Sequence, residues 1–536
     1  MQNLKATRWR VNSVLVLIAA IIAAPIIATV WGAFGESEAA AHLWSTNGFV
    51  YARTTVLLCV CVAVITGLFG AGLALLLSLA EFPGRRVMDV LLVLPFAIPA
   101  YVAAYAYGDF LGPFGPVASM IGAGAVPEIR SFWGAVFVMS LATYPYVFLA
   151  MRAGLAARSG ALMEAARLLG ANPWRAAMNL LAPLSRPALM GGLALALMET
   201  AAEFGVADYF GVKTLSVGIF RTWYGLGDLT AATQLASSLF LLMIILIVME
   251  AAARTGDTAD TVRSDRTATR LTLSTKAAGL ALLVCLVPVL FGFMIPTGVF
   301  LTKLDVTANL PRGFLSALGN TLFVAGLGAL LAGFAAIILA YGARTATSSI
   351  VRALVRIATL GYAIPGAVIA IGLLSLTTGF SKLTGIALMG TAATGIGVLV
   401  FAYVSRFLTA SYNATEGGLA QIGTRVDEAA HVLGARTSRV ITTIHLPLAR
   451  RAIAAGLAIV AIDIAKELPA TLILRPFNFE TLSTHIYRLA SDERLADAAP
   501  SALILIAVSL APVLLLSSQL NNKAARDKTD GLEAQT

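Results

Sequence analysis

Four acidic residues lie within stretches of the chain that are otherwise apolar. Glu199 and Glu203 stand four residues apart in METAAEFGVADYFG, and Asp463 and Glu467 repeat this spacing in AIDIAKELPATLILRPF. In a helix, residues four apart share one face. Carboxylates inside a membrane are costly and tend to face a bundle interior or an aqueous path. Oxygen ligands of this kind suit a hard cation, so the four residues form a candidate translocation path.

A structural role is the alternative for these carboxylates. Each pair lies next to a helix-ending residue, Gly205 or Pro469, and Lys466 could neutralise one of the charges. We assign no metal site and no catalytic residue, because the histidines form no ligand set: two are expected in outer segments and two in a cytoplasmic loop, namely His42, His485, His431 and His445.

A second repeated pattern lies between apolar runs, in Glu164–Pro183 (EAARLLGANPWRAAMNLLAP) and Glu428–Pro447 (EAAHVLGARTSRVITTIHLP). Each copy predicts a helix, a glycine turn and a second helix along the membrane face. Two matched loops predict two docking points for a two-fold partner, and helices that merely brace the bundle are the alternative. The candidate docking residues are Glu164, Ala165, Ala166, Gly170, Glu428, Ala429, Ala430 and Gly434.

The composition is that of an integral membrane protein. The 536 residues are 58% hydrophobic and only 12% charged, whereas soluble domains are about 25% charged. A spanning helix needs about 20 mostly apolar residues, which predicts twelve spans: Val11–Ala33, Thr55–Ala80, Val90–Tyr107, Phe132–Met151, Ala188–Phe204, Ala232–Ala253, Ala277–Ile295, Thr321–Tyr341, Ile357–Leu376, Ile386–Tyr403, Ala452–Leu468 and Ala499–Ser518.

The chain is a duplication. Ala97-Ile98-Pro99 returns as Ala363-Ile364-Pro365, close to the offset that relates the two loops. Six spans in each half predict an all-α fold of two parallel six-helix repeats, each with one cytoplasmic loop. The predicted divisions are a first core at 1–253, a linker at 254–276, a second core at 277–520 and a polar tail at 521–536.

The basic residues orient the protein. The formal net charge is +10, and most Lys and Arg fall in the segments on one side of the predicted spans. This positive-inside bias predicts that both termini are cytoplasmic, and it gives no reason to expect a nucleic-acid partner.

The two loops resemble the EAA–Gly–Ile-x-Leu-Pro loop of the permease subunits of ABC importers. The second copy fits with Ile444-His445-Leu446-Pro447, and the first departs with Leu180-Leu181-Ala182-Pro183. The resemblance implies a bacterial inner-membrane permease whose loops dock into a separate homodimeric ATP-binding subunit, and a periplasmic or extracellular solute-binding protein. The chain carries no Gly-x-x-x-x-Gly-Lys-Ser/Thr loop. We therefore expect ATP and Mg²⁺ on the partner, and no enzymatic activity or cofactor in this chain.

The stretches around the carboxylates, EFGVADYFGVKTLSVGIFRTWYGLGDLTAATQLAS and KELPATLILRPFNFETLSTHIYRLASDERLADAA, resemble the ferric iron permeases of this class, which carry two fused cores. Ferric iron is the cargo that this resemblance implies. Alternatives are an importer of the same kind for thiamine, a polyamine or an anion, and an ion-coupled secondary transporter. The mixed charges of the outer segment Arg475–Pro500 could dock the binding protein or be merely solvated.

Overall fold

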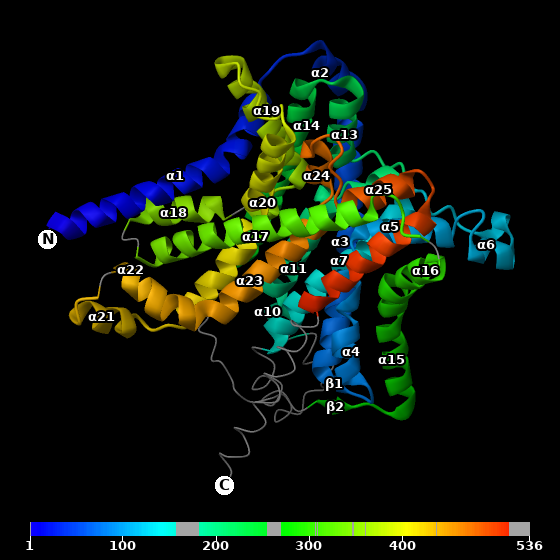
Figure 1. The fold of residues 1–536 in the computed structure, drawn as a ribbon. Coiled ribbons are helices and arrows are strands. Elements are labelled where there is room, and N and C mark those ends of the chain that lie inside the picture. The colour runs from blue at the N-terminus through cyan, green and yellow to red at the C-terminus, as the bar shows by residue number, and fades with distance from the viewer. Residues whose placement is uncertain are drawn as a thin grey trace, which may run out of the picture. The chain divides into compact units, whose positions relative to one another are not determined.

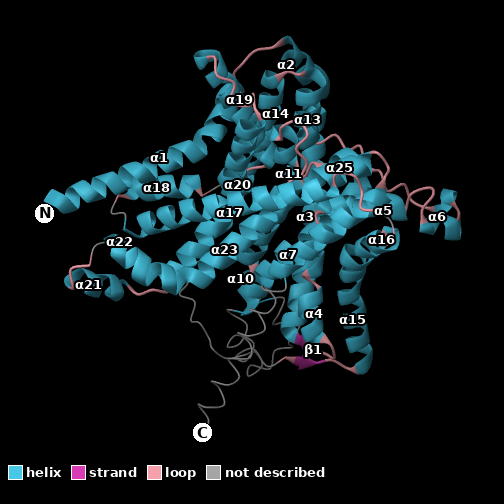
Figure 2. Cartoon of the chain, in the orientation of Figure 1, coloured by secondary structure: helices cyan, strands magenta, loops and turns pink. Residues whose placement is uncertain are grey.

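The computed structural model describes residues 2–156, 179, 182–254 and 270–513, apart from 306, 308, 346, 347, 360 and 436. Figure 2 shows that most of them lie in helices. Among the described residues the two strands, β1 (Ala80–Glu81) and β2 (Leu271–Thr272), are two residues long and pair in parallel. The all-α fold predicted from the apolar runs is confirmed.

Nine helices in the described part of the chain are long and apolar enough to cross a membrane, and a bent pair could add a tenth. The multi-pass membrane fold is thus confirmed, whereas the predicted count of twelve spans is not. The nine are Ser13–Gly32, Glu38–Leu79, Phe132–Leu155, Leu229–Ala253, Thr275–Lys303, Phe314–Arg344, Gly366–Thr384, Ala392–Ala420 and Leu495–Val513.

Two predicted spans form helices that are either too short or too charged to be counted. α11 (Arg186–Ala202) has 17 residues, fewer than a bilayer core requires. α23 (Leu446–Lys466) has 21 residues but also carries Arg450, Arg451 and Asp463.

Two further predicted spans, Val90–Tyr107 and Ile357–Leu376, are broken, so their prediction as continuous helices is wrong. In each half the Ala-Ile-Pro repeat ends a 3-10 turn, and its proline precedes a new helix. Pro99 has φ −57° and ψ 138°, and Pro365 has φ −56° and ψ 140°. The cause is the proline ring, which lacks an N–H and excludes helical geometry at the residue before it. In the first half the bend is 89°.

The chain divides into two compact units, each of which is described by itself. Unit 1 comprises residues 1–46, 218–240 and 312–485, and unit 2 comprises 47–217, 241–311 and 486–536. Each unit joins segments of both predicted cores. The division of the sequence into two cores and a linker stays a prediction.

The helices of unit 1, seen in Figure 1, are α1 (Gln2–Gly32), α2 (Glu38–Leu43), α17 (Phe314–Thr345), α18 (Ser349–Ala358), α19 (Gly366–Thr384), α20 (Ala392–Ala420), α21 (Thr424–Val432), α22 (Thr437–Val440), α23 and α24 (Pro469–Leu474). Those of unit 2 are α3 (Phe49–Leu79), α4 (Arg85–Leu91), α5 (Ala100–Phe110), α6 (Pro116–Ile121), α7 (Phe132–Ala156), α10 (Ala182–Leu184), α11, α12 (Gly205–Tyr209), α15 (Thr275–Val289) and α16 (Ile295–Lys303). Three helices have residues in both units: α13 (Leu215–Arg221), α14 (Leu229–Arg254) and α25 (Leu482–Ser491).

The same three-helix packing occurs in both units, with α3, α7 and α11 in unit 2 and α17, α20 and α23 in unit 1. Gly192 packs on the backbone of Val147, and Gly456 packs on the backbone of Ser411, its partner at the same offset. The backbone N–H of Leu215 donates to Thr55, and that of Leu482 donates to Thr321. These matched contacts confirm the duplication. The three helices in each unit also contribute residues to the buried apolar cluster of that unit.

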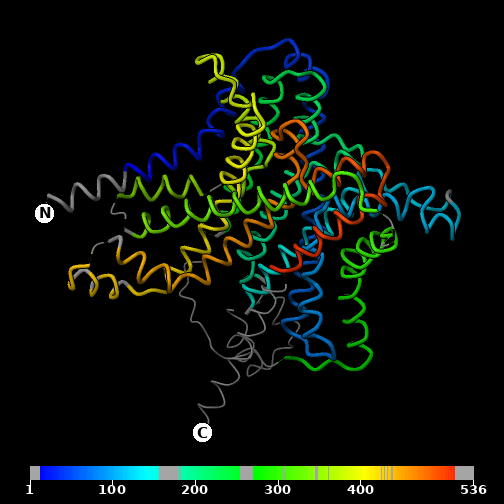
Figure 3. The backbone as a smooth tube through the Cα atoms, in the orientation of Figure 1, coloured from blue at the N-terminus to red at the C-terminus, as the bar shows by residue number. Residues whose placement is uncertain are grey.

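The first helices of the two halves are exchanged. α1 packs against α18 and α19 of the second half, where the Thr29 hydroxyl donates to the Val368 carbonyl at 3.1 Å. α15 and α16 pack against α4 and α5 of the first half, where the Lys303 ammonium lies 2.7 Å from Asp109. Figure 3 follows both contacts, blue α1 beside green α18 and green α15 beside blue α4.

Candidate functional site

Glu203 and Glu467 occupy the same place in the two halves, directly after a helix. α11 and α23 each end one residue earlier, and both glutamates have extended backbones, with φ −67° and ψ 127° for Glu203 and φ −68° and ψ 122° for Glu467. The prediction that each pair shares one face of a continuous helix is therefore wrong. Glu199 and Asp463 are helical and half-buried, whereas their partners lie in breaks where a new helix starts.

Glu467 is held by polar groups on both of its oxygens. Oε1 accepts from Arg406 Nη1 at 2.6 Å and from the Ala470 N–H at 3.1 Å, while Oε2 accepts from the N–H and the hydroxyl of Thr471, both at 3.0 Å. The carboxylate thereby satisfies the first free N–H groups of α24. Its side chain is 1% exposed. Glu467 therefore has the structural role given above as the alternative: it caps a helix and its charge is neutralised. The neutralising cation is Arg406, where the sequence suggested Lys466.

A glycine makes room for this ion pair. A Cβ on Gly366, the first residue of α19, would overlap Glu467 Oε1 and Arg406 Nη1. At the matched positions of the first half stand Ala100, with a Cβ, and Ala142, with no charge. The first half therefore builds its carboxylate site from other residues.

Glu203 repeats the cap without these two neighbours. Its Oε1 accepts from the Val206 N–H at 3.1 Å, as Glu467 does from Ala470, and so begins α12. Glu203 is half-buried. Because the two carboxylate pairs lie in different units, their predicted convergence on one path stays a prediction.

Phenol and carboxylate oxygens gather near Glu203 in unit 2. The Tyr487 hydroxyl donates to Asp208 Oδ2 at 2.9 Å, and its ring lies 5.7 Å from that of Phe204. Tyr105 is wholly buried, and its hydroxyl has no hydrogen-bond partner among the described residues. The ionisable groups that act electrostatically on this hydroxyl are Tyr101, Tyr487, Glu203 and Asp208.

The sequence reasoning missed this cluster, although the duplication contains a signal for it. At the positions that the duplication matches to the cluster residues stand apolar side chains, in the second half for four of them and in the first half for Tyr487. Tyr101, Tyr105, Asp208, Tyr209 and Tyr487 correspond to Ala367, Ile371, Leu472, Ile473 and Phe220.

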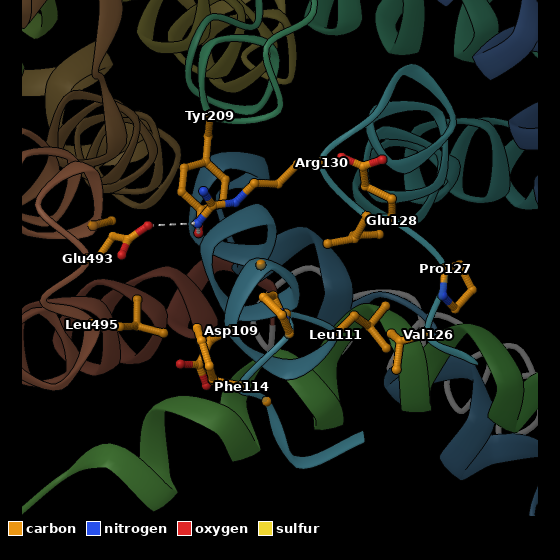
Figure 4. Close-up of a pocket in the computed structure, with 16 residues that line it drawn as sticks. Asp109, Leu111, Phe114, Val126, Pro127, Glu128, Arg130, Tyr209, Glu493 and Leu495 are labelled. Carbon is orange, nitrogen blue, oxygen red and sulfur yellow. Dashed lines mark hydrogen bonds and ion pairs between the residues drawn. The ribbon is translucent and has the colours of Figure 1, made fainter. Parts of the chain in front are cut away.

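A pocket of about 560 Å³ lies beside the cluster in unit 2. Figure 4 shows Tyr209 at its edge, with Arg130 against the ring and paired with Glu493. Arg130 donates to the Tyr209 hydroxyl at 3.1 Å and lies 3.6 Å from Glu493. The Tyr209 ring also packs edge-on against Tyr105, with centroids 4.7 Å apart. Tyr209 therefore lines the pocket and contacts the buried phenol.

The pocket is formed largely by the loop Asp109–Arg130, whose Gly and Pro content (GPFGP, then GAGAVP) predicts no regular helix. The short α6 within it contradicts that prediction, because Pro116 can start a helix at a position that needs no N–H. In the segment Arg475–Pro500, which the sequence predicts to be outside the membrane, Arg475 pairs with Glu480 at 3.4 Å and Arg494 with Asp497 at 2.6 Å. Docking of a binding protein there stays a prediction.

The second docking loop has the predicted helix, turn and helix. α21 and α22 flank Gly434, whose φ of +77° is one that glycine adopts most readily. Ala429 is exposed and Ala430 is buried. The side chain of Glu428 lies outside the described ones, as do the whole residues Glu164, Ala165, Ala166 and Gly170 of the first loop. The docking role of all eight residues stays a prediction.

Asp427 fastens this loop to the bundle. It lies 2.8 Å from Arg344 at the end of α17 and 2.6 Å from the buried His445. Arg344 also donates to the carbonyls of Leu419 and Ile422. Burial raises the pKa of Asp427, but the hydrogen bonds and charges of Arg344 and His445 outweigh burial, so the pKa is lowered.

At the matched positions the sequence of the first half has Ser78, Met163 and Leu181, none of which carries a charge. Its charges instead join α4 to α7. Arg152 donates to Ser78 at 2.9 Å and to Asp89 at 2.8 Å, and Arg85 contacts the same Asp89 at 3.0 Å.

No three His, Cys, Asp or Glu side chains come together as a metal site in the part of the chain that the structure describes. Comparison with known proteins gives a family. The family model for binding-protein-dependent transport system inner membrane components matches twice, at residues 63–254 and 328–526.

The chain is 27% identical over 477 residues to an Fe(3+)-transport system permease protein of Haemophilus influenzae, covering 86% of this chain and 88% of that one. It is 28% identical to a sulfate transport permease of Escherichia coli over 38% of this chain and 79% of the other. A molybdenum transport permease of Escherichia coli is 29% identical over 35% of this chain and 85% of the other.

Among solved structures, a bacterial alginate ABC transporter, in complex with an alginate pentasaccharide-bound periplasmic protein, is similar with a TM-score of 0.36. That match is 19% identical and covers 45% of this chain and 91% of the other.

Proposed function

Because the chain belongs to the family of binding-protein-dependent transport system inner membrane components, with one family domain in each half, we propose that it is the permease subunit of an ATP-driven ferric iron importer. Membership makes it a multi-pass transport protein of the inner membrane. The cargo, the motor and the orientation of the termini are the parts that we propose.

The choice of ferric iron as the cargo rests on how much of this chain each relative matches. The similarity to the ferric iron permease runs through both halves, over 86% of this chain, whereas the sulfate and molybdenum permeases match 38% and 35%. The electrostatics agree with this choice, since carboxylates such as Glu203 and Asp208 repel an oxyanion and attract a cation.

The motor is a homodimeric ATPase that binds ATP and Mg²⁺ and grips one loop of each half, with both chain termini on its side of the membrane. Closing of the dimer moves both loops and shifts the bundle between inward and outward access, through contacts that differ in the two states. Ala429, Gly434 and their neighbours form the contact in the second half. Val432 and Leu433, which are 87% and 86% exposed, supply the apolar surface of that contact. A periplasmic binding protein delivers the cargo at the outer face.

Reconstitution tests the proposal. The full chain is placed in liposomes with a candidate ATPase and a candidate binding protein, and uptake of ferric iron, sulfate, molybdate, thiamine and a polyamine is measured with and without ATP. We expect uptake of ferric iron that requires ATP and the binding protein. Uptake of sulfate or molybdate in its place would make the protein an oxyanion importer. Uptake that continues without ATP under an ion gradient would make it a secondary transporter.

A further inference from the structure

The hydroxyl of Tyr105 is buried and has no hydrogen-bond partner among the described residues, so it could coordinate a bound ion. A phenol out of contact with water and with no hydrogen bond loses a few kcal/mol relative to one that is bonded. Phenylalanine would fill the same space without this loss. The hydroxyl lies among Tyr101, Tyr487, Glu203 and Asp208, whose charges act on it. The hydroxyl therefore has oxygen-bearing groups around it that could share a bound ion.

The backbone of unit 2 fixes these donors. Pro99 sets the start of α5, which carries Tyr101 and Tyr105 on one face, four residues apart. The Glu203 cap sets the start of α12, which carries Asp208. The hydrogen bond from Tyr487 to Asp208 then joins α25 to α12.

We propose that Tyr105, Glu203, Asp208 and Tyr487 form a binding site for a hard, highly charged cation within unit 2 of the transporter. Carboxylate and phenolate oxygens are hard donors of the kind that such ions prefer over nitrogen or sulfur. A bound cation of high charge lowers the pKa of the groups that coordinate it, so the phenols bind as phenolates and release their protons. This inference rests on the proposed ferric cargo and adds where that cargo is held.

The pocket beside Tyr209 provides the approach. Its lining includes three carboxylates, Asp109, Glu128 and Glu493, and one guanidinium, Arg130. Lys303 pairs with Asp109 and Arg130 pairs with Glu493, so Glu128 supplies the negative charge that attracts cations. Tyr209 separates the pocket from Tyr105, and a Cβ on Gly108 would overlap the Tyr209 hydroxyl. Glycine at this position therefore lets the ring pack closely over α5.

Binding is tested on the purified full chain in nanodiscs, titrated with ferric citrate, with zinc(II) as the contrasting ion. The wild type should develop the visible charge-transfer absorption of a ferric phenolate with iron and no absorption with zinc. Tyr105→Phe should lower ferric affinity on the order of 10- to 100-fold, as the loss of groups around bound metals does, without lowering the unfolding temperature. Asp208→Asn should weaken binding in the same way.

The matched control is Tyr144→Phe, which removes a buried phenol from the same unit. The Tyr144 hydroxyl donates to the Leu92 carbonyl at 2.6 Å, so this change should lower stability and leave ferric binding as in the wild type. Ferric binding by Tyr105→Phe equal to that of the wild type would overturn the site, and so would a wild type that gives no ferric phenolate absorption.

Uptake in the reconstituted system separates this inference from the proposed function. If wild type and Tyr105→Phe import ferric iron equally, the site is wrong and the function stands. If the wild type binds ferric iron through Tyr105 but imports sulfate or molybdate, the function is wrong and the site stands.

Discussion

Glu203 and Glu467 descend from one duplicated position, and they now do different work. Both end a helix and cap the next one with nearly identical backbone angles. Around Glu467 the second half has an arginine, a glycine and apolar side chains, and the charge is neutralised inside the protein. Around Glu203 the first half has phenols and a second carboxylate. Both copies keep the same backbone geometry and helix cap. The surrounding side chains give Glu467 a structural role and make Glu203 part of a candidate binding site.

The largest difference is expected when each glutamate is removed. Glu467→Ala leaves the Arg406 guanidinium buried without its counter-charge, which should cost about 3–5 kcal/mol. Glu203→Ala removes a cap and should cost about 1 kcal/mol. Chemical denaturation of the two full-length variants in detergent measures this. Equal losses would mean that both glutamates are structural.

The second largest difference in stability between the two halves is expected from adding or removing one methyl group at matched positions. Gly366→Ala drives a Cβ into the Glu467–Arg406 pair and should cost about 1–3 kcal/mol. The matched Ala100→Gly should cost about 1 kcal/mol or less, through helix propensity alone. A larger loss for Ala100→Gly, measured in the same denaturation assay, would contradict the different packing of the two sites.

The docking loops should respond alike, which tests whether the halves share a motor. Gly434→Val opposes a φ of +77° and should cost about 1–2 kcal/mol, confined to the loop. Gly434→Val and Gly170→Val should both reduce ATPase stimulation and transport. Gly423→Val is the control, since a Cβ there meets no atom within 4 Å and the residue has no left-handed φ. Normal transport by both loop variants would remove the coupling role.

The smallest effect concerns pH and the second loop alone. Because the folded-state pKa of Asp427 is lowered, its ion pair adds stability that is complete above the unfolded value of about 3.9. This stability disappears as the pH falls through the lower folded value. In the wild type, the protection of α21 against hydrogen exchange should therefore fall at acid pH, by an amount that corresponds to about 1 kcal/mol or less. In Asp427→Asn this acid dependence should be absent. An unchanged acid response in the variant would assign the sensitivity to other groups.

Much of the fold could be predicted because membrane helices and repeats are local or periodic signals. The two helix breaks could also have been predicted from the Ala-Ile-Pro repeat, since proline ends helices by local geometry. They were missed because the apolar runs continue through both prolines. The Arg406–Glu467 pair joins residues 61 apart in sequence, and nothing local links them. Tyr105 stands in an apolar run where an aromatic side chain usually faces lipid or core, so only its neighbours in space identify it.

The exchange of first helices has a consequence for how the protein is made. Thr29 bonds to Val368, 339 residues later in the chain. At about 5–20 residues per second, the ribosome needs roughly 20 to 70 s to make that partner. During this time α1 is in the bilayer before its docking surface exists. Lipid or an insertion factor must cover that face until α18 and α19 arrive, so the packing of α1 is completed long after the helix itself has been made.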